Sequence, residues 1–269
     1  MEPERGADYP FCDGAAPSAK RRASIVPMQA VILAGGLGTR LRPLTNKVPK
    51  VMASVRGNEF LWYLLRWLER NQVSDVVICA AYLWEAIGRK VSSFSRPGMT
   101  VRLSIERQPL GTAGAVKHAE ALLHDEFFLI NGDTYLPLSY GEIVSHWQEI
   151  REQFACLLVL YSNREKIAPN DSATDGHGVV IAYSKRSCDG MEYVNAGLAV
   201  AKKSIFAALP EDVPASLEED VFPELISRRK IAALVTDTRY YDIGTPDRVR
   251  AFEEYLDDHP EAFSGETTG

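Results

Sequence analysis

The sequence has little of several features that would mark a specialised class of protein. Its four cysteines lie far apart without a CxxC pair, and no internal repeat or low-complexity block is present. This argues against a zinc ribbon, a disulfide framework and a repeat protein. No apolar run approaches the roughly 18 residues needed to cross a bilayer. The 30 Lys and Arg are outnumbered by 36 Asp and Glu, so we expect neither a membrane nor nucleic acid as a partner.

The rest of the composition is that of an ordinary globular protein. Of 269 residues, 46% are hydrophobic and 25% are charged, which is typical of a soluble domain. Residues 1–27 have neither a helical nor a strand period and predict a flexible leader, and residues 259–269 predict a frayed tail. Met28 stands directly before the first predicted strand, which fits a shorter native product that begins there. The leader lacks the apolar stretch of a secretory signal, so we expect a cytoplasmic protein.

Strand and helix patterns alternate through the first part of residues 28–258. Short apolar runs predict buried strands, and apolar residues three and four apart predict helices. The predicted strands are 29–34, 75–81, 101–105, 126–131 and 154–161, and the predicted helices are 60–70, 84–94, 113–123 and 139–150. This alternation predicts the α/β class, with a Rossmann-like, mostly parallel mixed sheet and helices on both faces.

The pattern changes after about residue 163. Strands over 178–184 and 193–201 have no helix between them. A helix over 217–229, a strand over 231–235 and a helix over 246–256 follow. We therefore expect a single domain over 28–258, whose last part is a second lobe or an excursion on the same sheet.

The segment from Ala34 to Lys50, AGGLGTRLRPLTNKVPK, predicts a binding site for a polyphosphate. Three glycines at 35, 36 and 38 follow a buried strand directly, where a backbone without Cβ atoms lets N–H groups approach a ligand. Four cations lie at positions 40, 42, 47 and 50 of a chain that is acidic overall. Glycines and cations together favour a loop that closes over a nucleoside triphosphate.

Two common phosphate-binding loops do not fit this segment. A P-loop needs GxxxxGK[ST], and no lysine follows a glycine in that way. A dinucleotide fingerprint needs a third small residue where Leu41 stands. It also opens straight into a helix, whereas Pro43 and Pro49 favour a long extended loop.

Four motifs resemble those of the sugar-phosphate nucleotidyltransferases, also called nucleotide-sugar pyrophosphorylases. GGLGTRLRPLT followed by PK is similar to their signature, QPLGTAG at 108–114 to their nucleoside-binding loop, NGD at 131–133 to their metal motif and DIGTP at 242–246 to their closing motif. The motifs occur in the family's order over roughly 28–256. The resemblance implies a fold of the nucleotide-diphospho-sugar transferase type, with a nucleotide-binding part over about 28–162 and a sugar-binding part over about 163–258.

The implied reaction joins two anions, a nucleoside triphosphate and a sugar 1-phosphate. An oxygen of the sugar phosphate attacks the α-phosphorus, pyrophosphate leaves, and a nucleotide-sugar forms. Cations and alignment therefore supply most of the rate enhancement. By resemblance, Asp133 and Asp242 share one Mg²⁺, which takes few carboxylate ligands and keeps several waters. Arg40 and Lys50 hold the phosphates, so Arg40, Lys50 and Asp133 are the implied catalytic residues.

The resemblance also implies which residues contact the nucleotide. They are Leu33, Ala34, Gly35, Gly36, Gly38, Thr39, Gln108, Gly111 and Thr112. The Gln108 amide is the implied reader of the base, but an amide is both a donor and an acceptor and does not choose between guanine and a pyrimidine.

The sugar side carries four further implied residues. Lys185 corresponds to the lysine of the family's Glu-Lys-Pro, although the flanking Glu and Pro are missing, so a plain surface lysine is the alternative. Asn195 and Gly197 resemble the family's sugar-facing Asn-x-Gly turn. Glu218 would accept hydrogen bonds from sugar hydroxyls; its alternative is a helix-start acid after a Ser216 cap.

Within this family, the chain most resembles the D-glycero-D-manno-heptose 1-phosphate guanylyltransferases, in its short length and in the segments MQAVILAGGLGTRLRP and YYDIGTPD. This resemblance implies GTP as the donor and GDP-heptose as the product. Mannose 1-phosphate guanylyltransferases and other uridylyl- and thymidylyltransferases stay open, as does a homo-oligomer. No C-terminal hexapeptide solenoid is present, which predicts a catalytic domain alone. Some relatives have lost catalysis and act as regulatory subunits. Such a chain would be expected to lose Arg40, Lys50 or an aspartate ligand, and all four are present.

Overall fold

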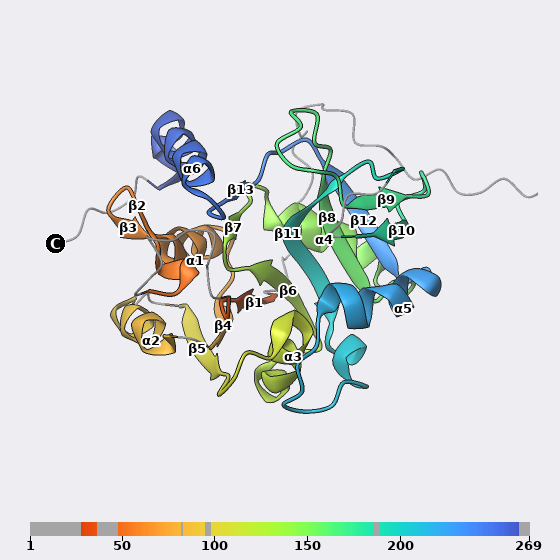
Figure 1. The fold of residues 1–269 in the computed structure, drawn as a ribbon, viewed down its shortest axis with the longest axis horizontal. Coiled ribbons are helices and arrows are strands. Elements are labelled where there is room, and N and C mark those ends of the chain that lie inside the picture. The colour runs from red at the N-terminus through yellow and green to blue at the C-terminus, as the bar shows by residue number, and fades with distance from the viewer. Residues whose placement is uncertain (1–27, 37–47, 82, 95–97, 185–188, 264–269) are drawn as a thin grey trace, which may run out of the picture.

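A seven-stranded sheet forms the centre of the protein (Figure 1). The computed structural model describes residues 28–36, 48–81, 83–94, 98–184 and 189–263. In spatial order the strands are β12 (Ile231–Thr236), β8 (Cys156–Tyr161), β11 (Val194–Lys202), β6 (Glu126–Asn131), β1 (Gln29–Leu33), β4 (Asp75–Ala80) and β5 (Thr100–Ile105). Strand β11 is antiparallel to β6 and β8, and the other neighbouring pairs are parallel. The predicted mostly parallel mixed sheet is confirmed.

Helices cover both faces of this sheet because its strands are apolar on both sides. In β1, Ala30 and Ile32 enter one core, whereas Val31 enters the other. The first core is closed by α1 (Phe60–Arg70), α2 (Trp84–Ser93), α4 (Tyr140–Ile150) and α6 (Pro246–Asp258). The second is closed by α3 (Gly111–His118) and α5 (Phe222–Ser227). Strands β11 and β12 extend the same sheet, and the free cysteines Cys79 and Cys156 are buried in the second core.

The described residues also form three two-stranded ribbons, of which only the strand Val180–Tyr183 corresponds to a predicted one, that over 178–184. They pair β2 (Ser54–Val55) with β3 (Asn58–Glu59), β7 (Thr134–Tyr135) with β13 (Tyr241–Asp242), and β9 (Ser172–Thr174) with β10 (Val180–Tyr183). Most of these strands are two or three residues long, too short to show a period. The β7–β13 ribbon matters most, because it joins the NGD and DIGTP segments.

Two predicted helices differ from those observed. The helix expected over 113–123 starts at Gly111 and ends at His118, and a 3₁₀ turn over Glu120–Leu122 follows. The Leu122 carbonyl there accepts a hydrogen bond from Gln29, so a tertiary contact fixes the tighter turn. The helix expected over 217–229 begins as a π-helical turn, Leu217–Val221, and α5 ends at Ser227.

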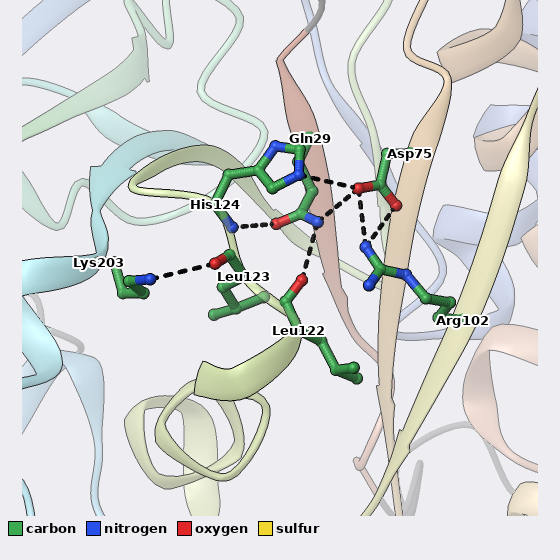
Figure 2. A network of polar contacts seen from close by, with 7 residues as sticks. All are labelled: Gln29, Asp75, Arg102, Leu122, Leu123, His124 and Lys203. Atoms are coloured by element: carbon green, nitrogen blue, oxygen red, sulfur yellow. Dashed lines mark hydrogen bonds and ion pairs between the residues drawn. The ribbon is translucent and has the colours of Figure 1, made fainter.

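The amino ends of the parallel strands meet in a polar network (Figure 2). The Gln29 side chain is 1% exposed; its Nε2 donates to Asp75 Oδ2 at 2.8 Å and to the Leu122 carbonyl at 3.0 Å, and its Oε1 accepts from the His124 amide at 2.9 Å. Arg102 Nη2 donates to both oxygens of Asp75 at 2.7 and 2.8 Å. Every polar atom of the buried Gln29 side chain thus has a protein partner.

Searching the described residues for a possible membrane span finds no helix with both the length and the apolar character that one would need.

Candidate active site

A cleft of about 710 Å³ lies at the opposite, carboxyl end of the parallel strands. Leu33 ends β1, Asn131 ends β6, and Glu106 directly follows β5; all three line the cleft. Ligands of α/β proteins bind at this edge because loops from several strands converge there. Residues of the second lobe, among them Asp171, Asn195 and Glu218, line the same cleft, so both predicted binding parts contribute to one cavity.

Two ion pairs lie in the middle of the cleft. Lys50 Nζ donates to Asp133 Oδ2, and Arg248 Nη1 donates to Asp242 Oδ2 at 2.6 Å. The two aspartates come together because Ile243 N donates to the Asp133 carbonyl at 3.0 Å and Asp242 pairs with Thr134 in the β7–β13 ribbon. Asp133 follows a long strand as expected, but Asp242 lies inside a two-residue strand.

Gly244 marks the point where these groups converge. A Cβ atom on Gly244 would stand 2.7 Å from Asp242 Oδ1, 3.8 Å from Lys50 Nζ and 3.9 Å from Arg248 Nη1. The Gly244 amide donates to Asp242 Oδ1 at 2.8 Å. A side chain at this position would displace the carboxylate, so the glycine of DIGTP leaves room for a compact cluster of charges.

The donor set of this cluster fits Mg²⁺. Two aspartates whose oxygens reach the cleft are the number of carboxylates that Mg²⁺ takes when phosphates and waters complete its octahedron. No group of three or more His, Cys, Asp and Glu side chains suited to a metal occurs within the described ranges. That argues against a closed, all-protein cation cage there and leaves Asp133 and Asp242 as the candidate ligands.

The predicted nucleotide-binding residues divide into three groups. Leu33, Ala34, Gly35, Gly36, Gly111 and Thr112 line the cleft. Gly38 and Thr39 lie outside the described residues, as does Arg40, which was predicted to be catalytic. Gln108 is exposed and does not line the cleft, so the structure does not bring the implied base reader to the cavity.

Glu106, two residues before Gln108, lines the cleft instead and is 5% exposed. Its Oε2 accepts from the Leu110 amide at 2.9 Å, while its buried Oε1 has no hydrogen-bond partner among the residues that the structure describes. Gly35 keeps the approach open, because a Cβ there would stand 3.2 Å from Oε1. Burial raises the pKa of Glu106 above its ordinary value, and the bond from Leu110 opposes this only in part. A buried acceptor without a donor is costly unless a ligand supplies one.

The QPLGTAG loop is tied to the second lobe. Gly111 has φ +73°, and a Cβ there would meet the Ala215 carbonyl oxygen at 2.5 Å. Ala113 N donates to that carbonyl at 2.9 Å. Thr112 Oγ1 donates to Glu218 Oε2 at 3.2 Å and accepts from the Leu217 amide at 2.8 Å. Gly111 therefore permits a close approach of two chain segments, and Thr112 links the nucleotide loop to the predicted sugar acid.

The predicted sugar side is rich in acceptors. Gly197, at φ +73°, donates its amide to Asn195 Oδ1 at 2.9 Å, which is the expected Asn-x-Gly turn. Asp171 Oδ1 accepts from the Asn195 amide at 2.8 Å and from Ser172 Oγ at 2.7 Å. Burial raises the pKa of Asp171, and the neighbouring Glu218 charge adds to this. Ser216 caps the turn through Glu219 N, so Glu218 combines a helix-start position with a place in the cleft. Lys185 lies outside the described residues.

Prediction from the sequence missed Glu106, Asp171 and Arg248. Glu106 has a signal in hindsight, since it directly follows a predicted strand, and Asp133 stands two residues after another. Arg248 lies in the first turn of α6, after the Thr245 cap, where acids are more usual. Asp171 belongs to an irregular stretch, and nothing in the local pattern marks it.

The chain is similar in sequence and in structure to sugar-phosphate guanylyltransferases and related proteins. The crystal structure of HddC from Yersinia pseudotuberculosis, complexed with GMP-PN, superimposes with a TM-score of 0.72 at 28% identity, over 85% of this chain and 99% of that one. The D-glycero-alpha-D-manno-heptose 1-phosphate guanylyltransferase of Campylobacter jejuni is 28% identical over 220 residues, which are 82% of this chain and 96% of that protein.

Another relative is the mannose-1-phosphate guanylyltransferase of Mycobacterium tuberculosis, 29% identical over 224 residues; this chain spans 62% of it. The sequence profile of the nucleotidyl transferase family matches residues 29–258, from the start of β1 to the end of α6. The profile thus covers both lobes that line the cleft. The chain belongs to the nucleotidyl transferase family.

Proposed function

We propose that the chain transfers a guanylyl group from GTP to D-glycero-D-manno-heptose 1-phosphate, giving GDP-heptose and pyrophosphate. The similarity to the Campylobacter jejuni heptose 1-phosphate guanylyltransferase extends over nearly that whole protein. The superposition on HddC complexed with GMP-PN supports a guanine nucleotide in the same fold. Because these substrates are metabolites of the cytoplasm, we propose that the enzyme works there.

Glu106 is the observation that carries the choice of guanine. Guanine presents two adjacent donors, N1–H and the 2-amino group, and a carboxylate is acceptor-only. Within the described ranges, Oε1 of Glu106 has no donor, and it lies beside Gly35, just after β1. The corresponding edges of adenine and cytosine each place a ring-nitrogen acceptor beside the amino group, and that acceptor would face the carboxylate. Guanine therefore satisfies the buried acid best.

The central charges would align the two phosphates. In the proposed reaction, an oxygen of the sugar phosphate forms a bond to the α-phosphorus of GTP while the bond to the β-phosphate oxygen breaks. Lys50 Nζ offers donors to both phosphates, and Asp133 and Asp242 would hold the metal. When bound, Mg²⁺ would offset the phosphates' mutual repulsion and the charge that develops on pyrophosphate.

In the part of the cleft that would hold the acceptor sugar, Asp171, Asn195 and Glu218 would bind its hydroxyl groups. Carboxylates and the amide oxygen accept hydrogen bonds from hydroxyl groups, and these residues line the second-lobe half of the cleft. A mannose 1-phosphate acceptor is the second candidate, supported by the similarity to the Mycobacterium tuberculosis guanylyltransferase.

Pyrophosphate release with Mg²⁺ tests the proposal. The purified chain is offered GTP, ATP, UTP, CTP and dTTP, each with heptose, mannose and glucose 1-phosphates. We expect GTP with heptose 1-phosphate to give the highest kcat/KM. A preference for mannose 1-phosphate would favour the second candidate, a preference for another nucleotide would refute the role of Glu106, and no turnover with any pair would favour a regulatory subunit.

A further inference from the structure

Few cations line the cleft in the part of the chain that the structure describes. Five lining residues are acids, Glu106, Asp133, Asp171, Glu218 and Asp242, whereas Lys50 and Arg248 are the basic ones. The substrates proposed above are both polyanions. Both described cations of the cleft are therefore candidates for binding phosphate. The proposed function assigns a role to Lys50 but none to Arg248.

The ion pair with Asp242 uses only one nitrogen of the Arg248 guanidinium. Arg248 Nη1 donates to Asp242 Oδ2 at 2.6 Å, and its side chain is 40% exposed, against 12% for Asp242. A guanidinium has five N–H donors in a fixed plane. Nε and Nη2, which form another edge of the same planar group, have no hydrogen bond to any described residue. The carboxylate thus fixes the plane and leaves a two-donor edge, the arrangement that binds phosphate bidentately.

The position of this edge points to the acceptor. The nucleotide half of the cleft is built by the ends of β1 and β5 and the start of α3, whereas Arg248 comes from α6 behind β13. Lys50 Nζ and Arg248 Nη1 lie within 3.8 and 3.9 Å of one point at Gly244. The guanidinium therefore lies next to the lysine proposed to align the phosphates, and it comes from the same part of the chain as Asp171, Asn195 and Glu218.

We propose that Arg248 binds the 1-phosphate of the acceptor sugar through Nε and Nη2, while Asp242 holds its guanidinium plane in place. This rests on the proposed function, in which a sugar 1-phosphate is the acceptor. Arg248 would thus bind the sugar phosphate independently of Lys185, whose surrounding motif departs from the family pattern.

Calorimetric titration without nucleotide or metal tests this, because no turnover then occurs. Heptose 1-phosphate, mannose 1-phosphate and inorganic phosphate are titrated into the unchanged chain, Arg248→Gln and Arg248→Lys. We expect Arg248→Gln to bind the acceptor phosphate about ten- to one-hundred-fold more weakly, since a charge-assisted pair of hydrogen bonds is lost. Arg248→Lys should recover only part, because it restores charge without the fork. In turnover, KM for the acceptor should rise while KM for GTP stays within about twofold.

Arg250 supplies the matched control. It lies on the same helix, is 67% exposed and pairs with Asp247, so Arg250→Gln removes the same charge without touching the cleft. Equal binding of phosphate by Arg248→Gln and the unchanged chain would overturn the inference and leave Arg248 as a residue that only positions Asp242. If the unchanged chain binds neither sugar phosphate, the proposed function fails instead, and the inorganic phosphate titration still decides the role of Arg248.

Discussion

The two ends of the parallel strands differ in how their buried hydrogen-bond acceptors are satisfied. At the amino end, Gln29 and Asp75 use their oxygens and the Gln29 amide hydrogens on neighbouring protein groups (Figure 2). At the carboxyl end, one oxygen of Glu106 has no donor in the described part of the chain, and Lys50 and Arg248 form ion pairs with aspartates. Both ends are rich in polar side chains, so polarity alone does not distinguish a binding site.

The acceptors distinguish them. The oxygens of Gln29 and Asp75 all have protein donors, although Arg102 Nε of the same network has no partner among the described residues. Buried acceptors that are satisfied in this way stabilise the fold and need no ligand. A network that leaves an acceptor unpaired, and places carboxylates together against few cations, is more stable when a ligand supplies the missing groups. The following predictions test this difference, beginning with the largest expected effect.

Asp133→Asn should lower kcat by about 10³-fold, because it removes one of the two candidate metal ligands while the amide keeps the shape of the side chain. The fold should be unaffected, since the Asp133 side chain is 34% exposed. Pyrophosphate release and circular dichroism measure both properties. An Asp133→Asn variant with full activity would refute the metal assignment.

Glu106→Gln should raise KM for GTP by about ten- to one-hundred-fold, because the amide can accept from guanine with its oxygen but opposes the second donor with its NH₂ group. Activity with other nucleoside triphosphates should change less, so the ratio of kcat/KM for GTP to kcat/KM for each other nucleotide should fall. Arg107→Gln, on the exposed neighbouring residue, is the control and should behave like the unchanged chain. Unaltered selectivity in Glu106→Gln would show that the base is read elsewhere.

Gln29→Ala should destabilise the fold by about 2–3 kcal/mol, since it opens a cavity and leaves Asp75, the Leu122 carbonyl and the His124 amide with fewer partners. Urea unfolding measures this effect. Turnover per folded molecule should stay the same, because the network lies at the far end of the strands. A large loss of kcat in the folded variant would contradict the separation of the two ends.

The stability effect of Glu106 should depend on pH. Its folded pKa is raised above the ordinary value of 4.5, so the protonated acid suits the fold and this contribution is lost as pH rises through the folded pKa. Glu106→Gln should therefore be more stable than the unchanged chain at pH 8, by on the order of 1 kcal/mol. The difference should shrink toward pH 4. Urea unfolding at both values checks this, and a constant difference would mean that the carboxyl group does not titrate in this range.

Much of the architecture could be predicted because it depends on local pattern. The helix over 60–70 and the strand over 126–131 have the predicted bounds, since an apolar stripe or a short apolar run needs no distant partner to be recognised. The glycine and aspartate motifs likewise placed Gly35, Gly36, Asp133 and Asp242 in one cleft. Strands as short as β7 and β13 could not be predicted, because only their pairing defines them.

The fold class, the position of the cleft at the carboxyl ends of the strands and the family could all be inferred from the amino-acid sequence. Alternating apolar segments and glycine loops encode them in neighbouring residues. Three contacts became visible only in the folded chain: Glu106 rather than Gln108 lines the cavity, Gly111 packs on Ala215, and Arg248 pairs with Asp242. Each of these depends on a contact between segments far apart in the chain, which burial and hydrogen bonding fix once the sheet has formed.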